Sequence, residues 1–204
     1  MEAFKNGTAQ VTIPDKTANP GPLGLLGFGL TTFLLNLCNA GAFPLDSMIL
    51  AMAFCYGGLA QIVAGIMEWK RGNLFPFLAF VSYGFFWWSL FFVVTLPGMG
   101  IAKAPDDTSM GCYLFIWGIF SFIMFVATLI KRAPISFSFL FLTVVVLFML
   151  LAGFHWTNNP RTLKTAGVEG IICGLTAIYI AAGELLNGFA GRTVLPLFER
   201  PPKV

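Results

Sequence analysis

The sequence is 204 residues long, is 57% hydrophobic, carries 10% charged residues and has a formal net charge of +3. Soluble domains carry about 25% charged residues, so the composition excludes an ordinary soluble domain and is typical of a membrane protein. The low net charge, in a sequence without any run of basic residues, also argues against a nucleic-acid partner.

Charged residues divide the chain into six apolar segments. Each segment is long enough for a helix to cross a bilayer, which needs ~20 residues. The six segments cover about residues 21–41, 47–68, 73–97, 109–130, 134–156 and 164–187. The connections between them are short, as expected for antiparallel neighbours. We therefore predict an all-α membrane protein with six transmembrane helices, composed of a polar N-terminal tail (1–18), a transmembrane domain (19–190) and a C-terminal tail (191–204).

The first predicted helix begins in the glycine-rich stretch Asn19–Thr32. Asn19 is a favourable N-cap residue, and the prolines at 20 and 22 have no N–H to lose in a first helical turn. Gly24, Gly27 and Gly29 are costly in an isolated helix, but they allow another backbone to come close. The free N–H groups at a helix N-terminus also favour an anion. We interpret this stretch as the entrance of a pathway that leads to the hydroxyl groups further along the helix.

Basic residues are distributed unevenly between the two sides of the predicted bundle. One side carries nine lysines and arginines: Lys5, Lys16, Lys70, Arg71, Lys131, Arg132, Arg192, Arg200 and Lys203. The other side carries three: Lys103, Arg161 and Lys164. Because positive residues remain on the cytoplasmic side of a membrane, both termini are expected in the cytoplasm. The expected location is the cytoplasmic membrane.

Polar side chains recur at helical spacing within several apolar segments. In the first segment they share one face of a helix at intervals of three or four residues: Phe28, Thr32, Asn36 and Asn39. Other segments contribute Gln61, Glu68, Ser82, Tyr83, Ser89, Thr176, Tyr179 and Glu184. Each such residue alone is adequately explained by hydrogen bonds between helices, with glycines permitting close packing. Several polar stripes in one small chain favour a lined pore instead.

Two glutamates fall within the sixth apolar segment. An intramembrane carboxylate is a functional candidate, but Glu169 and Glu184 both lie within a few turns of a helix end. The alternative is that they extend to the membrane surface or pair with Lys164 or Arg192. The nearby pattern Gly170–Gly174 favours helix packing, either within the chain or between subunits.

No enzyme chemistry is visible in the sequence. It has no Gly-x-Ser-x-Gly, no His-Glu-x-x-His and no pair of carboxylates at hydrolytic spacing. The four cysteines show no paired spacing and accompany no histidine cluster, so neither disulfides nor a metal site is expected. Trp87 and Trp88 lie in the middle of a segment, where core or subunit packing is expected. We expect no enzyme activity, no metal and no cofactor.

Several short motifs in this order and spacing resemble one known family, the acetate uptake transporters, also called succinate–acetate permeases. The first motifs are Asn-Pro-Gly-Pro-Leu-Gly-Leu at 19–25, Gly-Phe-Gly-Leu-Thr-Thr at 27–32 and Leu-Leu-Asn-Leu at 34–37. Further motifs are Tyr-Gly-Gly-Leu-Ala-Gln at 56–61, Ser-Tyr-Gly-x-Phe-Trp at 82–87, Gly-Glu-Leu-Leu-Asn at 183–187 and Gly-Arg-Thr-Val-Leu-Pro at 191–196. The resemblance extends over nearly the whole chain.

The resemblance implies a six-helix protomer assembled as a homohexamer, in which each protomer has its own pathway for acetate and, in some members, succinate. Uptake in the family is described both as proton-linked and as channel-like. Carried over to this sequence, the pathway uses Phe28 and Tyr83 as a constriction, with Gln61 nearby and Thr31, Thr32 and Asn36 lining it. Two positions depart from the family: Gly21 replaces a usual alanine, and Glu169 stands where an apolar residue is expected. No role for Glu169 can therefore be transferred.

The polar residues themselves fit a small monocarboxylate as substrate. Hydroxyl and amide groups, without lysine or arginine at membrane depth, hold an anion weakly enough to release it. The methyl group of acetate suits the ring of Phe28, and the hydroxyl of Tyr83 can donate to a carboxylate. Ser82 is expected to line the same path. For Glu184 we predict a role in assembly or in the geometry of the cytoplasmic end, rather than in proton uptake.

Two alternatives are compatible with the sequence. The first is a channel for small neutral solutes, which would differ in that flux would not depend on the anion or on pH. The second is a membrane scaffold, which would need exposed partner-binding tails that are nearly absent here.

Overall fold

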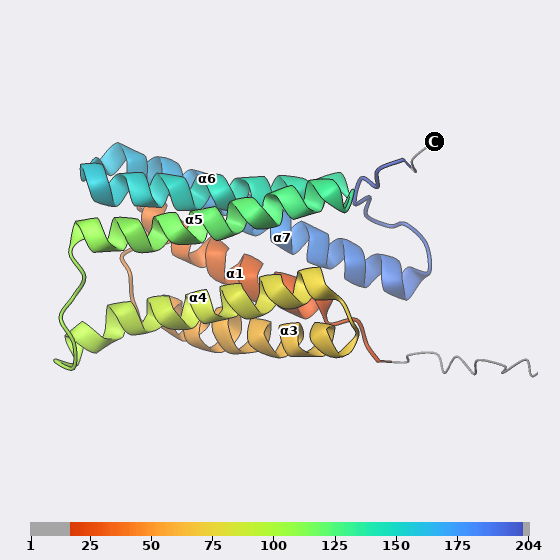
Figure 1. Ribbon diagram of the computed structural model, residues 1–204, viewed down its shortest axis with the longest axis horizontal. Helices are drawn as coiled ribbons and strands as arrows, with labels where there is room; N and C mark the ends of the chain where they lie inside the picture. The colour runs from red at the N-terminus through yellow and green to blue at the C-terminus, as the bar shows by residue number, and fades with distance from the viewer. Residues whose placement is uncertain (1–16, 202–204) are drawn as a thin grey trace, which may run out of the picture.

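The computed structural model describes residues 17–201, which form a bundle of helices without a strand (Figure 1). The elements are α1 (Gly21–Ala40), α2 (Ser47–Met52), η1 (Ala53–Ala60), α3 (Gln61–Lys70), α4 (Leu74–Gly98), α5 (Asp107–Ile130), α6 (Ile135–Thr157) and α7 (Pro160–Ala190). Because α2, η1 and α3 follow one another without a break, six of the described helical stretches are long and apolar enough to cross a membrane. The prediction of an all-α protein with six membrane-spanning helices is confirmed. Residues 1–16 of the predicted N-terminal tail (1–18) lie outside the described part of the chain.

The start of α1 is one residue later than the predicted cap implies. The helix begins at Gly21, so Pro20 occupies the N-cap position, and its ring cannot accept a hydrogen bond. The side chain of Asn19 supplies the missing acceptor, since its Oδ1 accepts a hydrogen bond from the backbone N–H of Gly21 at 3.0 Å. Asn19 therefore still satisfies one of the free donors of this helix end, from outside the N-cap position.

The second membrane-spanning helix is not an α-helix throughout. Its middle part, η1, is a π-helix of eight residues, in which the backbone hydrogen bonds span five residues instead of four. The wider backbone is supported from α4, where Nε1 of Trp88 donates to the carbonyl oxygen of Phe54 at 2.9 Å. A Cβ atom on Gly58 would meet the Trp88 ring, so glycine is required at this contact. The hydrophobic pattern of the sequence did not predict this π-helix.

Glycines bring α1 and α7 into backbone contact. A Cβ atom on Gly174 would lie 2.8 Å from the backbone nitrogen of Phe33 and 2.9 Å from the carbonyl oxygen of Gly29. One turn and two turns earlier on α7, Gly170 faces the amide of Asn36 and Gly167 faces the backbone of Ala40. Of the two uses predicted for the Gly170–Gly174 pattern, packing within the chain is the one observed here. We call this contact the glycine seam.

The two described ends of the chain lie at the same end of the bundle (Figure 1). The connections α3–α4 and α5–α6 lie there too and carry Lys70, Arg71, Lys131 and Arg132, so we call it the basic end. The C-terminal segment (192–201) folds back onto the first turn of α6 at this end. Its carbonyl groups accept hydrogen bonds from the backbone N–H of Ile135 at 2.9 Å and from the hydroxyl of Ser136 at 2.8 Å. The described part of the predicted C-terminal tail is therefore part of the bundle.

Candidate functional site

A cavity of about 550 Å³ leads from the basic end into the bundle between α1, α3, α4, α6 and α7. Its outer part is polar and is lined by Asn19, Glu68, Asn73, Lys131, Arg132, Glu184 and Glu199. Its inner part is apolar, with Leu25, Phe28, Ala79, Phe80, Tyr83, Leu140, Phe141 and Val144 around Gln61. Such a cavity has the size of a small-molecule site.

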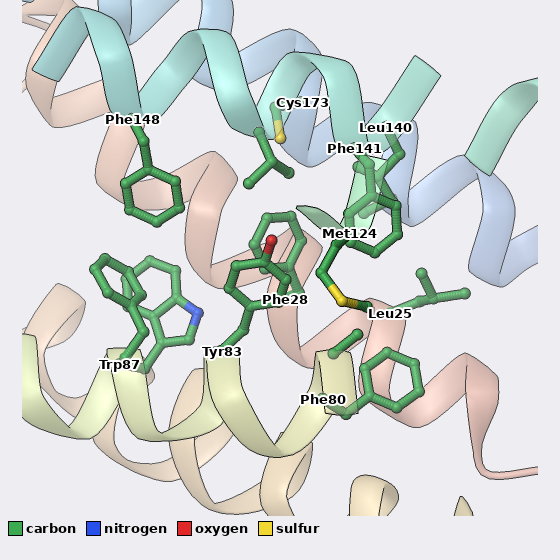
Figure 2. Close-up of a cluster of buried hydrophobic side chains, with 14 of the residues drawn as sticks. Leu25, Phe28, Phe80, Tyr83, Trp87, Met124, Leu140, Phe141, Phe148 and Cys173 are labelled. Atoms are coloured by element: carbon green, nitrogen blue, oxygen red, sulfur yellow. The ribbon is translucent and has the colours of Figure 1, made fainter. Parts of the chain in front are cut away.

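Two aromatic rings face each other at the inner end of the cavity. The ring centroids of Phe28 (α1) and Tyr83 (α4) are 5.6 Å apart, and the ring planes are inclined by 51°. Both side chains are buried, and the ring centroid of Phe141 (α6) lies 6.3 Å from that of Tyr83. Figure 2 shows Phe28 and Tyr83 together in the centre of the buried cluster. The two residues expected to form a constriction therefore do lie in contact.

The hydroxyl of Tyr83 is engaged within the protein. It donates a hydrogen bond of 2.9 Å to Oγ of Ser121 on α5, and Ser121 in turn donates to the carbonyl oxygen of Trp117 at 2.7 Å. This differs from the expectation that Tyr83 offers its proton to a carboxylate. The tyrosine oxygen can still accept a hydrogen bond, but its single proton is used to fix the orientation of the ring.

At the inner end of the cavity and beyond the two rings, α1 and its neighbours bury several polar atoms. The atoms Oγ1 of Thr31 and Thr32, Oε1 of Gln61 and Nε1 of Trp87 have no hydrogen-bond partner among the described residues. Their side chains are at most 2% exposed. Buried polar groups are almost always paired. Unpaired polar atoms from three helices therefore form a site at which a polar ligand would be stabilised by hydrogen bonds. Gly57 joins them, since a Cβ atom there would meet both the Trp87 ring and Thr31.

The polar stripe predicted on the first helix continues past these atoms. The amide of Asn36 donates to the carbonyl oxygen of Thr32 at 2.8 Å, and that of Asn39 donates to Oδ1 of Asn36 at 3.0 Å. Thr31, Thr32 and Asn36 do not line the cavity; they follow Phe28 on the way to the opposite end of α1. Ser82 is only half-buried and does not line the cavity either, so the structure does not bring it together with the other predicted residues.

A network of polar side chains surrounds the cavity mouth. Asn19 donates to Oε2 of Glu184 at 3.3 Å and accepts from Nη1 of Arg71 at 3.2 Å. Glu68 is 2% exposed and accepts a hydrogen bond from the amide of Asn73. The partner of Glu184 is thus an asparagine of the entrance, whereas the sequence had suggested a pairing with the basic residues near the helix ends. The Glu184 carboxylate lies against Gly21 in the first turn of α1, which places it beside Asn19.

Sequence reasoning gave no pathway role to Trp87, Phe141 and Val144. Trp87 had been assigned to packing, which its burial confirms, but nothing in the sequence indicated that its N–H would lack a partner. Phe141 and Val144 belong to a helix so uniformly apolar that no periodic signal distinguishes the face towards the cavity. The packing of α6 against α5 and α7 selects that face and brings Phe141 against Tyr83 of α4.

Known proteins resemble this chain over most of its length. The sequence model of the GPR1/FUN34/yaaH family matches residues 2–201 of this chain. The succinate-acetate/proton symporter SatP of Escherichia coli (strain K12) is 50% identical over 184 residues, which cover 90% of this chain and 97% of that protein. Acetate permease A of Emericella nidulans is 34% identical and covers 97% of this chain and 72% of the relative.

Among solved structures, that of the bacterial acetate channel SatP superimposes with a TM-score of 0.87 at 50% sequence identity. The match covers 89% of this chain and 99% of that structure. The relatives are named as transporters or channels, and the resemblance seen in the sequence motifs is confirmed. The chain is a multi-pass membrane protein that belongs to the GPR1/FUN34/yaaH family.

Proposed function

We propose that this chain carries acetate, and other small carboxylates such as succinate, through a pathway within each protomer. The observation that carries the proposal is the cavity that ends at the Phe28–Tyr83 ring pair, with unpaired buried polar atoms directly behind it. The printed names of the relatives support acetate as substrate. No enzyme reaction is proposed.

The chemistry of the pathway suits a small anion with an apolar end. A carboxylate has only acceptor atoms, and the hydroxyls of Thr31 and Thr32 and the N–H of Trp87 are donors without a partner among the described residues. The methyl group of acetate fits the contact surface of Phe28. Neither the inner cavity nor these atoms include a lysine or arginine, so the anion is not held by a fixed positive charge and can leave.

The basic end is proposed to face the cytoplasm, so that the cavity opens to the cell interior. The positive-inside rule supports this, because lysines and arginines flank the connections at that end. The glycine-rich start of α1 is then the cytoplasmic entrance, as the sequence suggested. We place the protein in the cytoplasmic membrane on the same grounds.

Flux through reconstituted liposomes tests the proposed function. We expect protein-dependent uptake of acetate, weaker uptake of succinate and little uptake of a neutral analogue such as acetamide, because a charged carboxylate accepts stronger hydrogen bonds from the donors behind the rings than a neutral amide does. An imposed proton gradient separates symport from channel: a symporter accumulates acetate against its own gradient, whereas a channel only equilibrates it. Equal uptake of acetamide and acetate would instead favour a channel for neutral solutes.

We also expect the protein to form a homo-oligomer, and specifically a hexamer. The single chain exposes many large apolar side chains, such as Phe85 at 50% and Phe122 at 53%, which lipid or further copies must cover. Native mass spectrometry in mild detergent and in nanodiscs measures the number of copies. A monomer in both media would contradict the prediction.

Glu184→Gln is expected to leave the pH dependence of acetate flux unchanged. Glu184 accepts a hydrogen bond from Asn19, and a glutamine retains an oxygen that can accept the same bond. The measurement is the ratio of acetate flux at acidic and neutral pH in liposomes, after gel filtration has shown an unchanged oligomer peak. Loss of the pH dependence in folded Glu184→Gln would assign proton uptake to this residue and refute its purely geometric role.

A further inference from the structure

Glu169 is a carboxylic acid that the structure places in an apolar part of α7. It is the only charged residue between Ala166 and Gly183. Both of its carboxylate oxygens are shielded from solvent, and neither has a hydrogen-bond partner among the described residues. The alternative from the sequence, a pairing with Lys164 or extension to the surface, is therefore not observed.

The position of Glu169 connects it with the pathway. The next residue, Gly170, lies against the amide of Asn36. Glu169 therefore lies at about the same depth in the bundle as Asn36. One turn further along α7, Cys173 is fully buried, and the next residue, Gly174, lies against the backbone of Gly29, which follows Phe28 on α1. Figure 2 shows Cys173 above the ring pair, on the side of the bundle where α6 and α7 lie. Glu169 thus lies about two helical turns past the ring pair, on the side away from the cavity.

No positive charge on the neighbouring helices neutralises Glu169. The only titratable side chain of α1 is Cys38. The only one of α6 is His155, whose Nδ1 lies 3.1 Å from the carboxylate of Asp107 on α5. On α7 itself the near titratable groups are Cys173 and the exposed Lys164, neither of which bonds to it. An ionised carboxylate without a partner is strongly disfavoured in such surroundings, whereas the protonated acid is tolerated.

We infer that Glu169 is a proton-binding residue that controls the passage of anions through this protomer. When Glu169 is protonated, the path at Asn36 is neutral and a carboxylate can pass. When it loses its proton to water in the path, its negative charge repels the carboxylate at the same depth. This inference rests on the proposed function.

Acetate currents through the reconstituted full-length chain test this inference. The membrane potential and the concentration of the acetate anion are held constant while pH is varied between about 5 and about 8. Protein-free vesicles give the background from diffusing acetic acid. For the wild type we expect the current to fall by about tenfold as pH rises. Glu169→Gln is expected to stay at the acidic level throughout, because its amide cannot ionise.

Two further variants serve as controls. Glu169→Asp keeps a carboxyl group and should keep the fall in current. Val168→Gln places the same amide at the neighbouring position, which is 56% exposed, and should behave as the wild type.

Infrared spectroscopy provides a measurement that is independent of transport. The wild type should show the carbonyl stretch of a protonated acid, and this band should be missing in Glu169→Gln.

The possible outcomes distinguish a failure of the proposed function from a failure of the role inferred for Glu169. Wild-type vesicles that carry no acetate would overturn the proposed function. Acetate flux with the same pH profile in the wild type and in Glu169→Gln would overturn only the role of Glu169. An infrared band that does not change in folded Glu169→Gln would also overturn it, because Glu169 would then not hold a proton.

Discussion

Phe28→Ala is expected to turn a selective path into a wide one. In the wild type the Phe28 ring contacts Tyr83 at 5.6 Å between centroids and closes the inner end of the cavity. An apolar restriction of this kind rejects hydrated ions, because they would have to shed water to pass. Removing the ring should raise total flux and lower the preference for acetate over succinate and chloride by about tenfold, which corresponds to about 1.4 kcal/mol. Competition between the anions in liposomes measures this preference.

The control for this experiment lies on the same helix. Phe33→Ala makes the same change at a half-buried position of α1 that does not line the cavity, so acetate preference should persist. Truncation of a core phenylalanine costs about 3–5 kcal/mol in soluble proteins, so both variants must first show the wild-type oligomer peak. Folded Phe28→Ala with unchanged selectivity would show that the constriction is not at this residue.

The second large effect is expected at the glycine seam. Gly174→Ala would place a methyl group against the backbones of Phe33 and Gly29, which cannot move aside as a flexible side chain would. Overpacking of this kind costs about 1–3 kcal/mol. The alanine itself favours a helix by about 1 kcal/mol over glycine, so the loss must come from the contact with α1. We expect a lower unfolding temperature in detergent and a reduced yield of the oligomer.

A matched control exists on the same helix. Gly188 is exposed and has no atom within 4 Å of the place that a methyl group would occupy, so Gly188→Ala gains helix propensity without a clash. Its unfolding temperature should equal or exceed that of the wild type. If Gly174→Ala and Gly188→Ala changed stability in the same direction, the backbone contact between α1 and α7 would not be a determinant of the fold.

The six membrane-spanning helices could be predicted because bilayer thickness fixes the length of each apolar segment. Their observed ends differ from the prediction most at the start of α7, where Pro160 and the cap of Asn159 extend the helix beyond the apolar run. The π-helix η1 could not be predicted, because its side chains are as apolar as those of an α-helix. Its geometry depends on the contact with Trp88 from another helix.

The site was predictable to a similar degree. The motifs and the polar stripe indicated Phe28 and Tyr83, and the rings do lie in contact. The direction of the Tyr83 hydroxyl could not be predicted, because it depends on Ser121, which lies 38 residues further along the chain. Ser82 illustrates the converse: a polar residue next to a site residue in a helix faces another direction, about 100° away around the axis.

The two flanks of the pathway differ in stiffness. On one flank α1 and α7 touch through backbone atoms at Gly29 and Gly174, which leaves no side chain that could rotate. On the other flank α4 meets α5 through tilted and edge-on rings, among them Tyr83 with Phe120 at 5.3 Å and Phe86 with Trp117 at 5.3 Å. Rings can pivot without separating helices, whereas a backbone contact cannot yield. The seam therefore acts as a rigid spine, and any widening of the path for a larger anion must be accommodated by the aromatic flank.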